Sequence, residues 1–250
     1  MRFNAKQMAQ EKDYAFPYHY LDLQGGGYNE NVWGLEYKAT LAFVKDRLRP
    51  FVGQRILDAG CGDGRFCFEL RDENVKLTGV DYSERAIAFA RAFNPNATFH
   101  VGELSALRLQ GKFDAAVMIE VLEHIPPSDI PAMMEALASL LKPRGRLVVT
   151  VPSVREKLHV KHYQHFTPSR LRDAIGPRFH VITMTGQNRV GIGRRLFAFA
   201  ERLAFFIGPF ERKRKPITAL FRAMRSHYFR HHAYGPPARC RRLMAVCEKA

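Results

Sequence analysis

The sequence predicts an α/β protein with a doubly wound parallel sheet, and three observations lead to this prediction. First, short apolar runs alternate with helical patterns over residues 55–151, which is typical of parallel strands with helices on both faces. Second, 250 residues of which 46% are hydrophobic suffice for one such domain with a sizeable core. Third, a glycine-rich loop follows the first apolar run, in the stretch ILDAGCGDGRF from Ile56 to Phe66.

The alternating region contains five predicted strands and three predicted helices. The strands are Arg55–Asp58, Lys76–Asp81, Thr98–Val101, Phe113–Ile119 and Arg146–Val151. The helices are Arg65–Arg71, Glu84–Ala92 and Ile130–Leu141. In such a sheet the crossovers are right-handed, and ligands bind at the carboxyl ends of the strands.

Further elements flank this region. Residues 34–48 carry leucine and valine at helical spacing and predict a helix. After the fifth strand, Thr167 is the predicted N-cap of a helix that has Pro168 in its first turn. A sixth strand is predicted at Phe179–Thr185 and a seventh at Leu243–Cys247.

The residues of the glycine loop indicate which class of nucleotide ligand it suits. A dinucleotide loop has a third glycine three residues after the second, and that position is Arg65. The Gly-Lys-Ser/Thr ending of a phosphate loop is absent. Asp58 and Asp63 would repel a pyrophosphate but suit a cationic amine. Gly60 and Gly62 would let a compact zwitterion approach the backbone.

Two further acids outline the rest of the ligand. Asp81 ends the second strand in TGVDYS, where a carboxylate can accept hydrogen bonds from both hydroxyls of a ribose. Glu103 follows the third strand in HVGELSAL, at the expected position of an adenine edge. An amine, a ribose and an adenine in this order describe S-adenosylmethionine.

The segments ILDAGCGDGRF, GVDYS, VGELSAL and FDAAVMIEVLEHIP resemble, in order and spacing, the motifs of class I S-adenosylmethionine-dependent methyltransferases. They are most similar to the branch that contains ubiquinone-biosynthesis, sugar and natural-product O-methyltransferases. The resemblance covers about Gly53–Pro152 and is weaker toward Thr185. It implies a Rossmann-like sheet of seven strands with an antiparallel last strand, and a helical insertion between strands 6 and 7.

The resemblance also implies S-adenosylmethionine as the cofactor and assigns residues to it. The methionine part would lie against the glycine loop, the ribose at Asp81, and the adenine at Glu103 and Leu104. Glu103 replaces the commoner Asp and adds one methylene. The predicted cofactor-binding residues are Asp58, Gly60, Cys61, Gly62, Asp81, Tyr82, Glu103, Leu104 and Glu120.

The stretch IEVLEHIP after the fourth strand offers groups for catalysis. A hydroxyl acceptor must lose a proton to a base, whereas a carboxylate acceptor need not. If the stretch is helical, Glu120, Glu123 and His124 share one face, as a base or a divalent-cation site would require. In the ubiquinone-type relatives the matching residues are associated with a metal ion. We do not favour a metal here, since Glu120 could line the cofactor pocket and His124 could brace the following loop.

A second histidine cluster follows the fifth strand in HVKHYQHF, with His159, His162 and His165. This places them on the side of the sheet where the acceptor must bind, although they could also hydrogen-bond loop backbone. His159 is the weakest of the three candidates. The predicted catalytic residues are His124, His162, His165 and Glu120.

Basic residues are concentrated near the C-terminus. Residues 189–250 hold 15 of the 39 Lys and Arg residues and 3 of the 24 acids, and therefore +12 of the formal charge of +15. Two basic, phenylalanine-rich stretches within 189–234 have helical apolar faces that suit an anionic membrane surface. The alternative is that these faces pack on the domain or on a second copy in a homodimer. A nucleic-acid partner is disfavoured because the aromatics are not interleaved for stacking.

The chain is expected to form a single domain of four segments. They are an N-terminal aromatic lid (1–34), the cofactor-binding core (35–186), the basic helical insertion (187–238) and the last strand (239–250). The lid prediction rests on YAFPYHY, for which ordinary packing is the alternative. No signal peptide, membrane-spanning run or paired-cysteine motif is seen, so we expect a cytoplasmic protein, free or peripherally attached to a membrane.

The predicted activity is methyl transfer to a hydroxyl oxygen of a small-molecule, sugar or lipid-linked acceptor. One alternative is an N-methyltransferase of small molecules. Another is an RNA-modifying or RNA-binding protein that uses the basic region, which a strongly salt-dependent RNA affinity would indicate. A third is a binding module that holds the cofactor without turnover.

Overall fold

The computed structural model describes residues 3–23, 34–48, 53–191, 193, 197–200 and 215–250, and omits the side chains of 215–218 and 221. Its elements in chain order are α1 Ala5–Asp13, η1 Tyr18–Leu23, α3 Leu35–Leu48, β1 Arg55–Ala59, α4 Arg65–Glu69, β2 Lys76–Asp81, α5 Glu84–Phe93, β3 Thr98–Val101, β4 Phe113–Ile119, η3 Leu122–His124, α6 Ile130–Leu140, β5 Leu141–Pro152, α7 Pro168–Ile175, β6 Phe179–Arg189, α9 Lys215–His231, β7 Tyr234–Gly235, η5 Pro237–Arg239 and β8 Cys240–Lys249.

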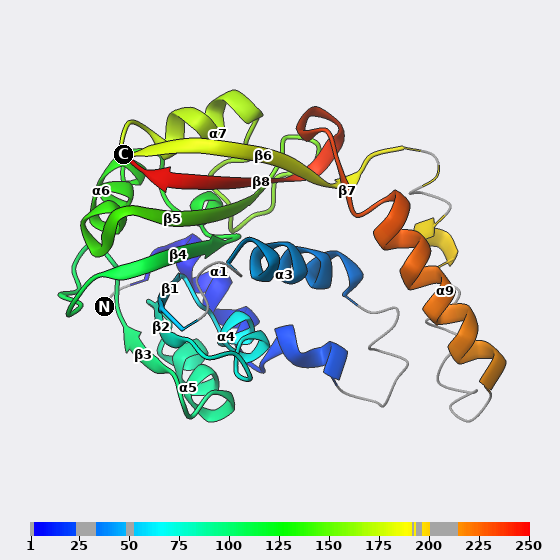
Figure 1. Cartoon of the computed structure of the whole chain (residues 1–250), viewed down its shortest axis with the longest axis horizontal. Coiled ribbons are helices and arrows are strands. Elements are labelled where there is room, and N and C mark those ends of the chain that lie inside the picture. The colour runs from blue at the N-terminus through cyan, green and yellow to red at the C-terminus, as the bar shows by residue number, and fades with distance from the viewer. Residues whose placement is uncertain (1–2, 24–33, 49–52, 192, 194–196, 201–214) are drawn as a thin grey trace.

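The strands form one sheet in the order β3-β2-β1-β4-β5-β8-β6-β7 (Figure 1). Strands β1 to β5 pair in parallel, while β8 lies between β5 and β6 and is antiparallel to both. The predicted Rossmann-like α/β fold with an antiparallel last strand is therefore confirmed. The expected count of seven strands is wrong by one, because the chain returning from α9 adds the two-residue β7 beside β6.

Both faces of the sheet are buried, as expected for a doubly wound fold. Side chains alternate along each strand, so Leu57 of β1 faces the core with α6 and α7, whereas its neighbour Ile56 faces the core with α3, α4 and α5. The same alternation separates Leu147 from Val148 in β5. Strand β4 is buried along six of its seven residues, which explains its continuous apolar sequence.

Local sequence signals fix the ends of several helices. Thr167 caps α7 by accepting a hydrogen bond from the backbone N–H of Arg170, and Pro168 occupies its first turn, both as predicted. In α1, Asn4 and Gln7 form a reciprocal capping box. This segment belongs to the predicted lid, but its helix was not predicted.

The third glycine of the loop allows two helices to approach each other. Gly64 has a φ of +79°, and a Cβ at this position would lie 2.8 Å from the Cβ of Ala90 in α5. Real Cβ atoms do not approach so closely, and the positive φ is itself unfavourable for other residues. Gly64 therefore serves the packing of α4 against α5.

The basic insertion is described only in part, and residues 201–214 of its predicted helices lie outside the described residues. Tyr228 of α9 is fully buried with Leu35 and Ala39 of α3 and with Phe197, whereas Leu220 on the same predicted face is 57% exposed. The predicted apolar face is thus divided between packing on the domain and solvent. None of the described helices combines the length and hydropathy needed to cross a bilayer.

Candidate active site

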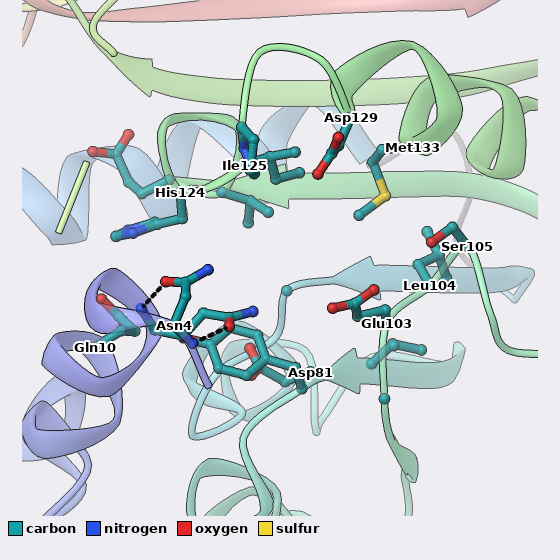
Figure 2. A pocket seen from close by; sticks show the side chains of 18 of the residues that line it. Asn4, Gln10, Asp81, Glu103, Leu104, Ser105, His124, Ile125, Asp129 and Met133 are labelled. Carbon is teal, nitrogen blue, oxygen red and sulfur yellow. Dashed lines mark hydrogen bonds between the residues drawn. The ribbon is translucent and has the colours of Figure 1, made fainter. Parts of the chain in front are cut away.

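A pocket of about 320 Å³ opens at the carboxyl ends of the parallel strands. It lies beside the neighbouring strands β1 and β4, where the strand order of the sheet reverses direction, which is the usual ligand position in this class of sheet. In Figure 2, His124 and Gln10 lie at one end, Glu103 and Ser105 at the other, and Asp81 between them.

The pocket wall contains most of the predicted cofactor-binding residues. Those in the wall are Gly60, Asp81, Tyr82, Glu103, Leu104 and Glu120. The other three belong to β1 or to the glycine loop but are not part of this wall, and they are Asp58, Cys61 and Gly62.

Asp81 is held by backbone donors on both carboxylate oxygens. Its Oδ2 accepts the N–H of Gly62 at 2.9 Å, and its Oδ1 accepts the N–H of Ser83 at 2.9 Å. Burial raises the pKa of Asp81 to about 6 despite these hydrogen bonds. Because each carboxylate oxygen can accept more than one hydrogen bond, Asp81 retains the capacity to bind a diol.

The two glycines predicted to contact the cofactor have different surroundings. Gly60 has a φ of +83°, and a Cβ there would lie 2.5 Å from the side chain of Val121, so only glycine fits this part of the wall. Gly62 instead makes room for the hydroxyl of Tyr14, which lies 2.6 Å from where its Cβ would be. Its N–H supports Asp81, so Gly62 acts here on the pocket's residues and on the N-terminal segment.

The two aspartates of the glycine loop are both buried but differ in their partners. Asp58 accepts a long hydrogen bond of 3.7 Å from the Cys67 thiol, and burial raises its pKa to about 7. Asp63 pairs with His19 of η1 at 2.9 Å. Neither lines the pocket, so the expectation that both carboxylates face a cationic amine is not met.

Glu120 corrects the predicted helical face. Its φ is +56° at the end of β4, and only Leu122–His124 form a 3-10 turn, so Glu120 does not share a helix with Glu123 and His124. The carboxylate accepts hydrogen bonds from Thr150 Oγ1 at 3.0 Å and from Arg242 Nε at 2.9 Å. A carboxylate held in this way forms a fixed anionic wall and is a poor choice for the predicted base.

His124 is the predicted catalytic histidine that lines the pocket. Its ring lies edge-on to that of His162, with 4.7 Å between the ring centroids. Burial lowers the pKa of His124 to about 4 and that of His162 to about 3, so both rings are neutral near pH 7. A neutral imidazole in a pocket wall can accept a proton from a bound hydroxyl.

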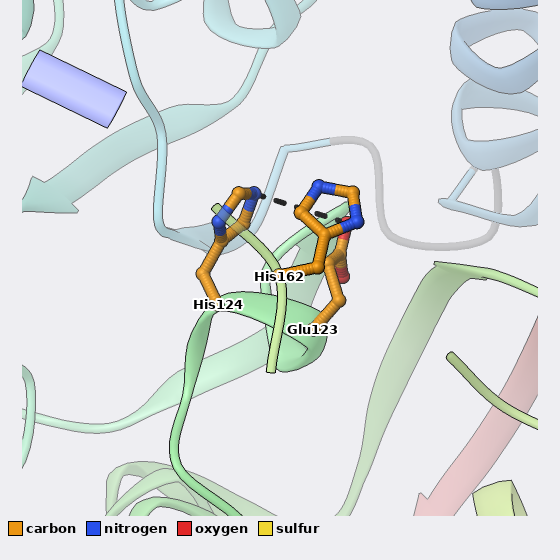
Figure 3. Close-up of side chains that lie close together, drawn as sticks. All are labelled: Glu123, His124 and His162. Carbon is orange, nitrogen blue, oxygen red and sulfur yellow. Dashed lines mark ion pairs between the residues drawn. The ribbon is translucent and has the colours of Figure 1, made fainter. Parts of the chain in front are cut away.

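The residues that lie close enough to share a metal ion differ from the predicted ones. Ligand atoms of Glu123, His124 and His162 lie within 4.8 Å of one another (Figure 3), whereas Glu120 is bound to Arg242. Burial and the nearby Glu120 raise the pKa of Glu123 well above its usual range, which favours its protonated form. The preference against a metal stays a prediction, and we call Glu123, His124 and His162 the polar cluster.

His162 and His165 lie behind His124 and do not line the pocket. His162 Nδ1 lies 2.8 Å from His165 Nε2, and His165 Nδ1 lies 3.1 Å from the carbonyl oxygen of Glu156. A carbonyl only accepts, so His165 donates from Nδ1. In the tautomer of His165 that carries its proton on Nδ1, the Nε2 atom accepts from His162 Nδ1–H. This chain of hydrogen bonds leaves a lone pair on His162 Nε2. The remaining residue of the cluster, His159, is exposed to solvent.

The N-terminal helix supplies wall residues that the sequence analysis missed. Asn4, Gln7, Gln10 and Tyr14 all line the pocket, and only Tyr14 belongs to the aromatic run that predicted a lid. The capping-box spacing of Asn4 and Gln7 was the signal that could have revealed the helix.

Contacts to the histidine segment hold this helix in place. Lys6 Nζ donates to the backbone carbonyls of Val160 and His162 at 2.9 and 2.6 Å. Asp13 pairs with Lys161 at 2.7 Å. The helix and the histidine segment thus form one continuous border around the pocket.

Comparison with known proteins identifies the family. A family model described as "Methyltransferase domain" matches residues 33–182, which span the glycine loop and the pocket. The chain belongs to the methyltransferase domain family. The resemblance of its motifs to class I S-adenosylmethionine-dependent methyltransferases is confirmed by this match and by the sheet order.

Similar proteins with curated names are ubiquinone biosynthesis O-methyltransferases. That of Xanthomonas axonopodis pv. citri (strain 306) is 34% identical over 116 residues, covering 44% of this chain and 47% of the relative. That of Idiomarina loihiensis is 29% identical over 113 residues, covering 43% and 46%. The chain therefore matches less than half of the length of these relatives.

Solved structures share the fold at low identity. Magnesium protoporphyrin IX methyltransferase from Synechocystis PCC 6803, solved with bound S-adenosylmethionine, is 19% identical with a TM-score of 0.61, covering 100% of this chain and 99% of its own. An N-methyltransferase from Bradyrhizobium japonicum WM9 is 13% identical with a TM-score of 0.63, covering 98% and 99%. A [4+2]-cyclase is 23% identical with a TM-score of 0.57, covering 84% and 79%, so the fold alone does not decide the reaction.

The residues of the pocket fit the cofactor of this family, S-adenosylmethionine. Asp81 can accept from the ribose hydroxyls, and Glu103 at the far end can accept from the adenine amino group. Gly60 exposes backbone between these acids and Glu120. Glu120, held by Arg242, is part of the same wall, where its carboxylate can stabilise a sulfonium.

Proposed function

We propose that the protein transfers the methyl group of S-adenosylmethionine to a hydroxyl oxygen of a small-molecule, sugar or lipid-linked acceptor. The observation that carries this proposal is the neutral His124 in the pocket wall, at the end opposite Glu103. An oxygen nucleophile needs a base at this place, and a neutral imidazole is suited to the task. The names of the curated relatives support the same choice.

The residues divide the work along the pocket. Asp81 and Glu103 bind and orient the nucleoside. When bound, S-adenosylmethionine supplies an electrophilic methyl group on a sulfonium. His124 takes the proton of the acceptor hydroxyl, and Glu120, fixed by Arg242 and Thr150, keeps its charge at the sulfonium end without taking that proton. Closure of α1 over the pocket excludes water and aligns the acceptor for in-line displacement.

The experiment measures turnover of labelled S-adenosylmethionine with fractionated cell extract and with simple phenols, sugars and amines, with and without chelator. We expect label in a hydroxyl compound, unaffected by chelator. His124→Ala should reduce kcat by roughly 100-fold, while the affinity for S-adenosylhomocysteine stays unchanged. His180→Ala, at an exposed position on β6, is the matched control.

Three outcomes would contradict the proposal. Label found only in amines would indicate an N-methyltransferase. Full activity of His124→Ala would exclude this residue as the base. Parallel loss of cofactor affinity in His124→Ala would indicate a structural role.

A further inference from the structure

An exposed segment beside the pocket carries an unusual set of side chains. Between β5 and the histidine cluster, Val154, Leu158 and Val160 are 52%, 53% and 74% exposed. Single exposed aliphatics are common on protein surfaces, but three within seven residues of one loop form a local apolar surface. We call residues 154–160 the exposed loop.

The loop has two basic side chains and one acidic side chain. Arg155 and Lys157 are exposed between the aliphatic residues. Glu156 is 33% exposed, and both of its oxygens bind Arg241 of β8. The loop therefore presents apolar and cationic groups to solvent, while its negative charge is paired with an arginine.

The exposed loop adjoins the pocket. Just beyond it, Tyr163 donates its backbone N–H to the carbonyl of Glu123 at 2.7 Å, which attaches the segment to the turn that carries His124. On the other side, the carbonyl of Val160 accepts from Lys6 of α1, a wall helix of the pocket. The outer side of the N-terminal segment adds exposed Met8 and Phe16.

We propose that the exposed loop, with the outer side of α1, docks on an anionic lipid bilayer surface. Aliphatic side chains interleaved with cations match an interface in which acyl chains lie beneath negative headgroups. Docking here would bring the His124 end of the pocket close to the bilayer, where an amphiphilic acceptor dissolves.

This surface differs from the basic insertion for which the sequence predicted a membrane role. In the described part of that insertion, Leu220 of α9 is exposed, but α9 packs on α3. It shares no described contact with α1 or with the exposed loop. The two surfaces can therefore be tested separately, and docking does not rest on the proposed methyl transfer.

The test is vesicle flotation of the full chain with phosphatidylcholine alone or mixed with phosphatidylglycerol. We expect wild type to float with anionic vesicles only, and the double variant Leu158→Glu/Val160→Glu to reduce the bound fraction by roughly tenfold. Ile182→Glu is the matched control, because Ile182 is 52% exposed on β6, and it should float as wild type does. Unchanged affinity for S-adenosylhomocysteine verifies that the variants are folded.

Several results would overturn the proposal. Failure of wild type to float with anionic vesicles would exclude the bilayer as partner. Equal flotation of the double variant, or loss of flotation in Leu220→Glu alone, would move docking away from the exposed loop. A double variant that changes the oligomeric state without changing flotation would assign the loop to contacts between copies. Turnover on soluble acceptors is measured separately, so a failure of docking is distinguishable from a failure of methyl transfer.

Discussion

His165 illustrates how a residue without access to the pocket can affect its chemistry. The carbonyl of Glu156 fixes the proton of His165 on Nδ1, and His165 in turn fixes the proton of His162 on Nδ1. The lone pair of His162 then faces the polar cluster with Glu123 and His124. A residue that acts through another in this way is a positioning residue.

His165→Leu removes this acceptor and should lower kcat by roughly 10- to 100-fold, because the ring of His162 loses its fixed orientation. The affinity for S-adenosylhomocysteine should not change. His165→Gln retains an acceptor oxygen and should restore much of kcat. Kinetics of the three proteins between pH 6 and 9 check this, and equal losses in both variants would show that only packing matters.

Single residues also show where sequence reasoning succeeds. Asp81 and Glu103 could be predicted because a motif ties an acid to the end of a particular strand, and strand ends meet at one edge of the sheet. The hydrogen bonding of Glu120 could not be predicted, because its partner Arg242 is 122 positions away and its positive φ leaves no mark in the sequence. The pairing of Glu156 likewise depends on Arg241, which belongs to a strand distant in the sequence.

At the scale of elements, the helix α1 and the histidine segment are joined across the pocket entrance. The ion pair of Asp13 and Lys161 is partly exposed, so it contributes little by itself, in the range of about 0.2–1 kcal/mol. It nevertheless connects a helix that lines the pocket with the segment that holds His162. Opening of the pocket must separate these partners.

Reversing this pair tests whether α1 closes over the cofactor. Lys161→Glu and Asp13→Lys alone should each weaken binding of S-adenosylhomocysteine about threefold, in keeping with a surface ion pair. The double variant Asp13→Lys/Lys161→Glu restores the attraction and should recover most of the affinity. Titration calorimetry on wild type, the two single variants and the double variant gives the coupling free energy between Asp13 and Lys161. If the losses of affinity in the single variants simply add in the double variant, the pair does not secure the helix.

The elements themselves were predictable to different degrees. Strands β1 to β4 match their predicted ranges within a residue. In β4, burial of six of the seven residues leaves a nearly continuous apolar run that the sequence shows directly. Helix α1 has a polar sequence and was missed as a helix. The apolar face of α9 was recognised, but not its partial burial, because Tyr228 packs on α3 through tertiary contacts that no local pattern encodes.

At the scale of the whole molecule, buried histidines and buried aspartates have opposite effects on how the folding stability depends on pH. His124 and His162 have folded-state pKa values of about 4 and 3, below an unfolded value of about 6.5. The stability that these two histidines contribute to the folded state is complete above pH 6.5 and is lost as the pH falls toward 4. Asp81 and Asp58 have folded-state pKa values of about 6 and 7, above 3.8, so their contribution is lost as the pH rises through these values.

As the pH rises from about 4 to 6.5, the stability gained from the two histidines nearly cancels the stability lost from the two aspartates, so the stability of the unliganded protein should change little over this range. Asp58→Asn removes the cost of a buried charge, and should raise Tm at pH 8 by on the order of 5 °C while gaining little at pH 5. Asp72→Asn, at an exposed surface acid, is the control. Thermal denaturation from pH 4.5 to 9 provides the measurement, and a lower Tm of Asp58→Asn at pH 8 would contradict the assignment.

The position of β8 has a consequence for how the protein is made. This strand lies between β5 and β6 although its residues follow both in the chain, and it carries the arginines that pair with Glu120 and Glu156. During translation, β5 and β6 must wait, unjoined and with exposed edges, until residues 240–249 have left the ribosome. Arg242 can fix Glu120 in the pocket wall only after β8 has joined the sheet, so nascent chains without β8 should bind the cofactor less tightly.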